Sequence, residues 1–276
     1  MRITRVLWLG GVLVLLLWGV AGAQESRVPE AYGELKQSLI RGGLDKDFIN
    51  RTFADSRNQF LPDIVRKIAH LRKERPADYR HFRSPEVVAR GREYLQEHRR
   101  DLIKAEARYG VARGVIVAIL TVESNLGAVT GKYSVFNVFA SLAVMDTPEV
   151  RRRVDLAPRL SERLKKKSGW ARRELKTFLE YCQSRGLDPF QFKGSWAGAM
   201  GFAQFLPSSL KNAGADGDGD GLVDLYNHAD AIFSIASYLA KSGFKQDQQS
   251  TWRRAVLRYN NSDAYAETVL YLAKRY

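Results

Sequence analysis

The chain has 276 residues, of which 44 are Lys or Arg and 30 are Asp or Glu, so its formal net charge is +14. This length is sufficient for one large domain or two smaller ones, each with a hydrophobic core. Cys182 is the only cysteine, which excludes an intramolecular disulfide. The charge indicates an acidic polymer as partner, with a merely soluble basic protein as the alternative.

Residues 1–23 are typical of a secretory signal peptide. Arg2 and Arg5 precede an apolar run, Trp8–Val20, and Ala21-Gly22-Ala23 is a small-residue cleavage site. An uncleaved anchor is the alternative. Cleavage removes two arginines and no acidic residue, so +14 becomes +12. No cysteine directly follows the segment, so lipid attachment at the cleavage site is unsupported. We therefore expect a soluble, periplasmic protein that has no integral membrane segment once the signal peptide is cleaved.

Helical periodicity predicts a mainly α fold, and because period-two alternation is scarce, any sheet should be small. Residues 24–85 are expected to form an N-terminal helical region, broken at Pro76. The segments with the clearest helical pattern are 45–53, 61–71, 87–109, 114–127, 170–184, 229–240 before Gly243, and 250–259. The basic segment 151–167 is expected to be a solvated helix or loop, or else to contact an anionic ligand.

Glu123 is the first candidate for chemistry. Helical spacing places it in register with Ile116, Ile119 and Leu120, so its side chain should face inward. Apolar surroundings destabilise an ionised carboxyl group and raise its pKa, which suits a general acid near neutral pH. The alternatives are an exposed glutamate near a helix end and a buried glutamate paired with an arginine.

Residues 216–230 predict a calcium loop, because acidic residues alternate with glycines from Asp216 to Gly221. The last ligand position of a twelve-residue loop holds Asn227, so Asp230, three residues later, is the better closing ligand. The candidate ligands are the side chains of Asp216, Asp218, Asp220 and Asp230 and the backbone carbonyl of Leu222. A solvated turn is the alternative.

Residues 194–209 are rich in glycine and alanine, which allow a ligand to approach the backbone closely. Trp196, Phe202 and Phe205 offer flat apolar faces, and Ser195 and Gln204 offer hydrogen bonds. This mixture suits a sugar. Tight helix packing explains the composition equally well. The four histidines lack zinc spacing, and no phosphate-binding loop is present in the sequence.

Taken in order, Val122–Gly127, Gly194–Ser209, the aspartate loop and Arg258-Tyr259-Asn260 resemble the lytic murein transglycosylase B family. The resemblance extends from about Leu44 to the C-terminus. It implies a lysozyme-like catalytic core over residues 86–276, with an EF-hand-like calcium loop at 216–230 and a structural Ca²⁺ ion.

The resemblance also implies roles for individual residues. Glu123 would be the single catalytic acid/base, and Ser195 and Gln204 would contact the substrate. Tyr259 and Tyr265 would line the sugar cleft, with Asn260 beside them. Residues 139–178 are longer and more basic than the family pattern, so a substrate-binding role for any of Arg151, Arg152 and Arg153 stays open.

The implied reaction is cleavage of the β-1,4 bond between N-acetylmuramic acid and N-acetylglucosamine in peptidoglycan, leaving a 1,6-anhydromuramic acid end. Peptidoglycan glycan strands are then the expected partner, together with cell-wall assembly complexes, and nucleic acid is not. Two rival hypotheses remain: a lysozyme-type hydrolase, in which a second acid activates water, and a noncatalytic wall-binding scaffold. Glu123 argues against the scaffold, because a buried acid costs stability.

Overall fold

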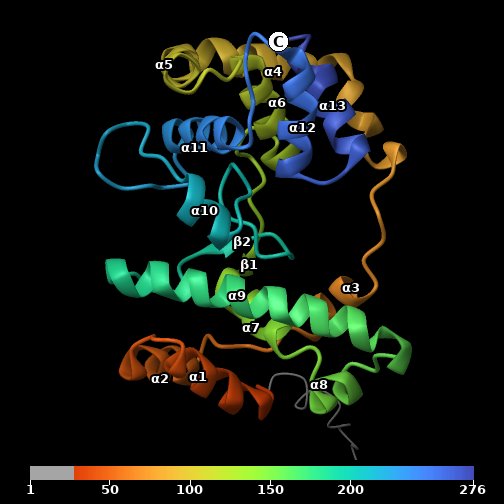
Figure 1. Ribbon diagram of the computed structural model, residues 1–276, viewed down its shortest axis with the longest axis vertical. Coiled ribbons are helices and arrows are strands. Elements are labelled where there is room, and N and C mark those ends of the chain that lie inside the picture. The colour runs from red at the N-terminus through yellow and green to blue at the C-terminus, as the bar shows by residue number, and fades with distance from the viewer. Residues whose placement is uncertain (1–27) are drawn as a thin grey trace, which may run out of the picture.

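The computed structural model describes residues 28–276, and these form two groups of helices joined by a narrow middle layer (Figure 1). Helices α4, α5, α6, α11, α12 and α13 gather at one end, and α1, α2, α3, α7, α8 and α9 gather at the other. Helix α10 and the strands β1 and β2 lie between the groups. Residues 1–23, the predicted signal peptide, lie outside the described residues.

The helices are α1 (Ala31–Arg41), α2 (Lys46–Ala54), α3 (Pro62–Ala69), the 3-10 helix η1 (Pro76–Arg83), α4 (Pro85–Glu97), α5 (Arg99–Tyr109), α6 (Arg113–Ser124), α7 (Val135–Ala143), α8 (Pro148–Arg153), the 3-10 helix η2 (Pro158–Leu160), α9 (Ser161–Arg185), α10 (Pro207–Ala213), α11 (His228–Lys241), α12 (Gln249–Tyr259) and α13 (Asp263–Ala273). The strands β1 (Tyr133–Ser134) and β2 (Lys193–Gly194) pair antiparallel, with Tyr133 opposite Gly194. The predictions of a mainly α fold and a small sheet are confirmed.

Local sequence signals explain where many helices begin and end. Asp45 caps α2 through a 2.7 Å hydrogen bond that its side chain accepts from the amide of Phe48. Proline occupies the first position of α3 and of α4, where its missing N–H is tolerated. Gly110 ends α5 in the left-handed region, at φ 62°. These signals place the helices close to the segments expected from periodicity.

Three expected boundaries are corrected. The stretch 87–109 contains two helices, α4 and α5, which are divided at His98. Pro76, expected as a break, is the first residue of the 3-10 helix η1. The basic segment 151–167 contains α8, η2 and the start of α9, which continues without a break to Arg185. Periodicity missed this continuity because Gly169, inside α9, weakens a helical pattern without ending the helix.

Helix α6 forms the centre of one group, and every residue from Val115 to Leu120 is 0% exposed. It is buried on all sides because α4, α5, α11 and α13 pack against it. A helix that is apolar all round favours such an enclosed position. The C-terminal end of α6, whose last turn contains Glu123, points toward the middle layer (Figure 1).

The two groups are not consecutive in sequence. Helices α7, α8 and α9 lie with α1, α2 and α3, and the Ser141 hydroxyl of α7 accepts a 2.9 Å hydrogen bond from the amide of Leu61. One continuous cluster of buried apolar residues runs through both groups. The division into residues 24–85 and 86–276 stays a prediction. Among residues 28–276, no helix has both the length and the apolar character needed to cross a membrane.

Candidate active site

Glu123 lies in the last turn of α6, where Asn125 ends the helix in the left-handed region at φ 52°. Its side chain is partly buried, and Oε1 accepts a 2.6 Å hydrogen bond from the hydroxyl of Tyr265. Burial raises the pKa of Glu123 to about 7, opposed by the hydrogen bond from Tyr265 and assisted by the negative charge of Glu74. Such a carboxyl group can both donate and accept a proton near neutral pH.

Three tyrosines surround this carboxyl group. The ring of Tyr265 stacks on Tyr259 at 6.5 Å between centroids and meets the edge of Tyr79 at 6.2 Å. Burial raises the pKa of each of the three hydroxyls above its usual value of 10, so all three stay neutral donors. We call Tyr79, Tyr259 and Tyr265 the tyrosine cluster. The partner of Glu123 is therefore a neutral hydroxyl and not an arginine.

Tyr265 is 1% exposed, and its hydroxyl is directed at Glu123, so its position suits holding the carboxyl group. Its expected place in the sugar cleft stays a prediction. Tyr259 and Asn260 remain partly exposed and can face a ligand. Phe205 is only 2% exposed and packs against Tyr259, with 5.8 Å between the ring centroids. Its ring therefore has no exposed face on which a sugar could pack.

Two residues at this site were not expected from the sequence. Tyr79, in η1, belongs to the tyrosine cluster, and Glu74 accepts a 2.5 Å hydrogen bond from its hydroxyl. The Asn260 amide nitrogen is 3.5 Å from both carboxylate oxygens of Glu74. Both residues come from the region assigned to N-terminal helices, and no spacing in that region links them to Glu123.

The segment 194–209 folds as a series of tight turns in the middle layer. The hydroxyl oxygen of Ser195 accepts hydrogen bonds from the amides of Ala197 (3.3 Å) and Ala199 (3.1 Å). Gly131 approaches this segment so closely that a Cβ atom there would lie 2.1 Å from the carbonyl oxygen of Gly194. Its φ of +94° also disfavours any side chain. The backbone of the segment 194–209 is thus in close contact with the backbone at Gly131, as its glycine content indicates.

Gln204 is held at a positive φ of 47°, which is uncommon for a residue with a side chain. Its Nε2 donates to the carbonyl oxygens of Thr130 (3.2 Å) and Gly201 (2.8 Å), which uses both amide hydrogens. Tyr259 donates a 2.5 Å hydrogen bond to the carbonyl oxygen of Ala203. The segment is therefore joined both to the residues that follow Glu123 and to the tyrosine cluster.

The other two aromatic residues of this segment are partly exposed. Trp196 lies under the ammonium group of Lys67, which is 4.2 Å from the ring centroid. Phe202 packs against His228, with 4.5 Å between the two ring centroids. A Cβ atom on Gly127 would come within 3.2 Å of the Phe202 ring. The segment 194–209 thus reaches helix α11 on one side and α3 on the other.

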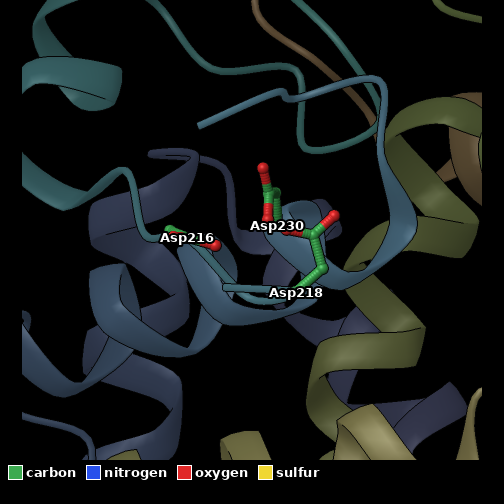
Figure 2. Close-up of side chains that lie close together, drawn as sticks. All are labelled: Asp216, Asp218 and Asp230. Atoms are coloured by element: carbon green, nitrogen blue, oxygen red, sulfur yellow. The ribbon is translucent and has the colours of Figure 1, made fainter. Parts of the chain in front are cut away.

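Three carboxylates of the aspartate loop converge. Figure 2 shows Asp216 and Asp218 on the loop close to Asp230 in the first turn of α11, and one carboxylate oxygen of each lies within 4.8 Å of the others. Asp230 is 1% exposed, and burial raises the pKa of its carboxyl group. Its two oxygens accept hydrogen bonds from the amides of Gly217 (2.7 Å) and Asp224 (2.6 Å).

The remaining predicted ligands lie outside this group. Asp220 is exposed and its carboxylate accepts a 2.8 Å hydrogen bond from the amide of Leu222, which is 62% exposed. Asn227 caps α11 and also donates a 2.7 Å hydrogen bond to Asp218. The three converging carboxylates provide oxygen atoms only, and Ca²⁺ prefers oxygen ligands. The donor set is therefore suited to that ion.

The basic segment 151–167 contacts residues on both sides of α3. The Arg153 guanidinium is 4.7 Å from the ring centroid of Phe60, and Arg163 donates a short hydrogen bond to the carbonyl oxygen of Leu71. These arginines contribute to packing between segments. A role for Arg151, Arg152 or Arg153 in substrate binding stays open.

Solved structures share this fold. The Escherichia coli lytic transglycosylase SLT35 in complex with calcium aligns with a TM-score of 0.72 at 24% identity, covering 90% of this chain and 92% of that one. SltB3 from Pseudomonas aeruginosa in complex with NAG-anhNAM-pentapeptide aligns with a TM-score of 0.72 at 26% identity, covering 87% and 77%. The class that the fold defines is thus that of the lysozyme-like transglycosylases.

Residues 28–256 match the family described as the transglycosylase SLT domain, and the chain belongs to this family of lytic transglycosylases. The membrane-bound lytic murein transglycosylase B of Escherichia coli (strain K12) is 35% identical over 168 residues. That alignment covers 61% of this chain and 42% of the relative, so less than half of the relative's length is matched. The resemblance drawn from the four motifs is confirmed.

Proposed function

We propose that the chain is a peptidoglycan lytic transglycosylase that cleaves the β-1,4 bond between N-acetylmuramic acid and N-acetylglucosamine. The observation that carries the proposal is Glu123, a partly buried carboxyl group with a pKa of about 7, held by Tyr265 at the end of the central helix. Family membership and the fold shared with SltB3 support the choice of substrate class.

In the proposed first step, Glu123 donates its proton to the glycosidic oxygen as the bond from that oxygen to C1 of muramic acid breaks. In the second step, the C6 hydroxyl oxygen of the same sugar bonds to C1 and its proton passes to the now ionised Glu123. The products are a 1,6-anhydro ring and a new 4-hydroxyl group, and Glu123 is again protonated. Because the attacking group belongs to the substrate, its effective concentration is high when the sugar is held in place.

The proposed sugar contacts follow from the hydrogen-bonding capacity that remains in the segment 194–209. Both Nε2 hydrogens of Gln204 are used, so its Oε1 is the atom available to accept from a sugar hydroxyl or amide. The oxygen of Ser195 accepts two bonds, which directs its hydroxyl hydrogen toward another acceptor. Asn260 and the partly exposed face of Tyr259 complete the proposed set.

We also propose that Asp216, Asp218 and Asp230 hold a structural Ca²⁺ ion. Three clustered carboxylates repel one another, and a divalent cation would neutralise them and join the loop to α11. The calcium complex of SLT35 supports the choice of ion. Asp220 and the carbonyl of Leu222 enter this ligand set only through the spacing of the calcium-loop pattern, and the chemistry at Glu123 needs no metal.

The predicted signal peptide supports a periplasmic location, where peptidoglycan strands are accessible.

The reaction requires Glu123 to be protonated at its first step, so its pKa sets the pH dependence. We expect release of soluble fragments from purified peptidoglycan to be fastest below about pH 7 and to fall as pH rises through 7, approaching a tenfold loss per unit. Fragment release is measured by chromatography between pH 5 and 9. Release that stays constant up to pH 9 contradicts the assignment of Glu123 as the acid, and no release at any pH contradicts the proposed function.

A further inference from the structure

We propose that Glu74 is a positioning residue of this active site: it holds the tyrosine cluster and Asn260 in place, and its negative charge favours the protonated form of Glu123. The inference rests on the proposed function for its effect on activity. Its effect on the protonation of Glu123 is measurable without any activity.

Glu74 joins two elements of the site that are far apart in sequence. Its Oε2 accepts the 2.5 Å hydrogen bond from Tyr79, and its two oxygens are 3.5 Å from Nδ2 of Asn260, a separation of 186 residues along the chain. Asn260 directly follows Tyr259, the residue that stacks on Tyr265. Tyr79 meets Tyr265 edge-on, and Tyr265 donates its hydrogen bond to Glu123, so Glu74 is linked to Glu123 through two tyrosines of the cluster.

The segment that carries Glu74 is fixed at both ends. Residues 70–75 connect α3 to η1 and run between the two helix groups (Figure 1). Arg163 bonds to the carbonyl oxygen of Leu71 at one end. Arg72 makes two hydrogen bonds to Asp78, of 2.7 and 2.8 Å, at the other. Glu74 is exposed, but the contacts on either side of it and its hydrogen bond from Tyr79 hold it near the tyrosine cluster.

The charges around Glu123 give the direction of the effect. From η1, α12 and α13, the titratable groups acting on Glu123 are Tyr79, Tyr259 and Tyr265, whose raised pKa values keep them neutral. Glu74, on the segment before η1, is the group in this set that carries a negative charge, and it raises the pKa of Glu123. Removing that charge makes ionisation of Glu123 easier and lowers its pKa.

The activity test compares the pH profiles of the wild type, Glu74→Gln and Glu74→Asp. We expect Glu74→Gln to move the fall in fragment release to lower pH by about 0.5 unit, which is about a threefold lower rate above pH 7. Glu74→Asp keeps the charge and should keep the wild-type profile. Glu162→Gln removes one charge from an exposed position on α9 and is the matched control, expected to leave the profile unchanged.

The second readout is the titration of Glu123 itself, followed by NMR of ¹³C-labelled glutamate carboxyl groups and assigned with Glu123→Gln. A titration midpoint that falls in Glu74→Gln but not in Glu162→Gln supports the proposal, even if the wild type releases no fragments and the proposed function fails. A midpoint and profile unchanged in Glu74→Gln overturn it, and so does a Glu74→Asp variant that shifts as far as Glu74→Gln.

Discussion

Replacing Glu123 by Gln is expected to lower the rate of fragment release from peptidoglycan by a factor of about 10² to 10⁴. The amide has nearly the shape of the carboxyl group and can still accept the hydrogen bond from Tyr265, but it cannot donate a proton to the leaving oxygen and retrieve another. Rates are measured by chromatography of the soluble fragments, at equal protein concentration and at the wild-type pH optimum.

The controls for this substitution are the binding of peptidoglycan and the thermal stability of the variant. Cosedimentation with insoluble peptidoglycan should match the wild type, and the melting temperature should not be lower, since the amide keeps the packing volume and replaces a carboxyl group whose ionised form is disfavoured by burial. Glu162→Gln, the same change on the exposed surface of α9, should keep full activity. A Glu123→Gln enzyme within threefold of the wild-type rate would show that another group supplies the proton.

Calcium is expected to stabilise the folded chain, and a chelator to lower its melting temperature. An ion that binds only the folded state contributes about 2.7 kcal/mol at a hundredfold excess over its dissociation constant. For a protein of this size, that free energy corresponds to a rise of about 5 to 10 °C in melting temperature. The physical reason is repulsion between the carboxylates of Asp216, Asp218 and Asp230 when no cation neutralises them. Scanning calorimetry with calcium and with chelator measures the difference.

Two substitutions test which residues hold the ion. Asp230→Asn should abolish the response to calcium, because its carboxylate is one of the three that converge. Asp220→Asn should leave most of the response, because Asp220 lies outside that group. If chelator leaves the wild-type melting curve unchanged, the loop is a solvated turn. If Asp220→Asn removes the response as fully as Asp230→Asn, the ligand set proposed here is wrong.

Much of the helical fold was predictable because its signals are local. The apolar run in α6 predicts a buried helix, the caps at Asp45 and Gly110 mark helix ends, and alternating aspartates and glycines predict the acidic loop. The order of motifs then indicated the family. Each helix signal and each motif consists of neighbouring residues in the sequence, so no knowledge of tertiary contacts was required.

The rest of the site depends on contacts between distant residues. Tyr265 is 142 residues from Glu123, and Asn260 is 186 residues from Glu74. The pattern of neighbouring residues does not reveal such contacts, which is why Glu74 and Tyr79 were missed. Similarly, Asp220 looks equivalent to Asp216 and Asp218 in the sequence, but only the latter two converge with Asp230, which comes from the following helix.

The chemistry that follows from a single carboxyl group is tested most directly by the mass of the released fragments. Purified peptidoglycan is digested, and the muropeptides are analysed by mass spectrometry before and after borohydride reduction. The proposed mechanism predicts fragments ending in 1,6-anhydro-N-acetylmuramic acid, each lighter by one water than the lysozyme product and resistant to reduction. Predominantly reducible ends would contradict it, because they require water as the attacking group and a second residue to activate that water.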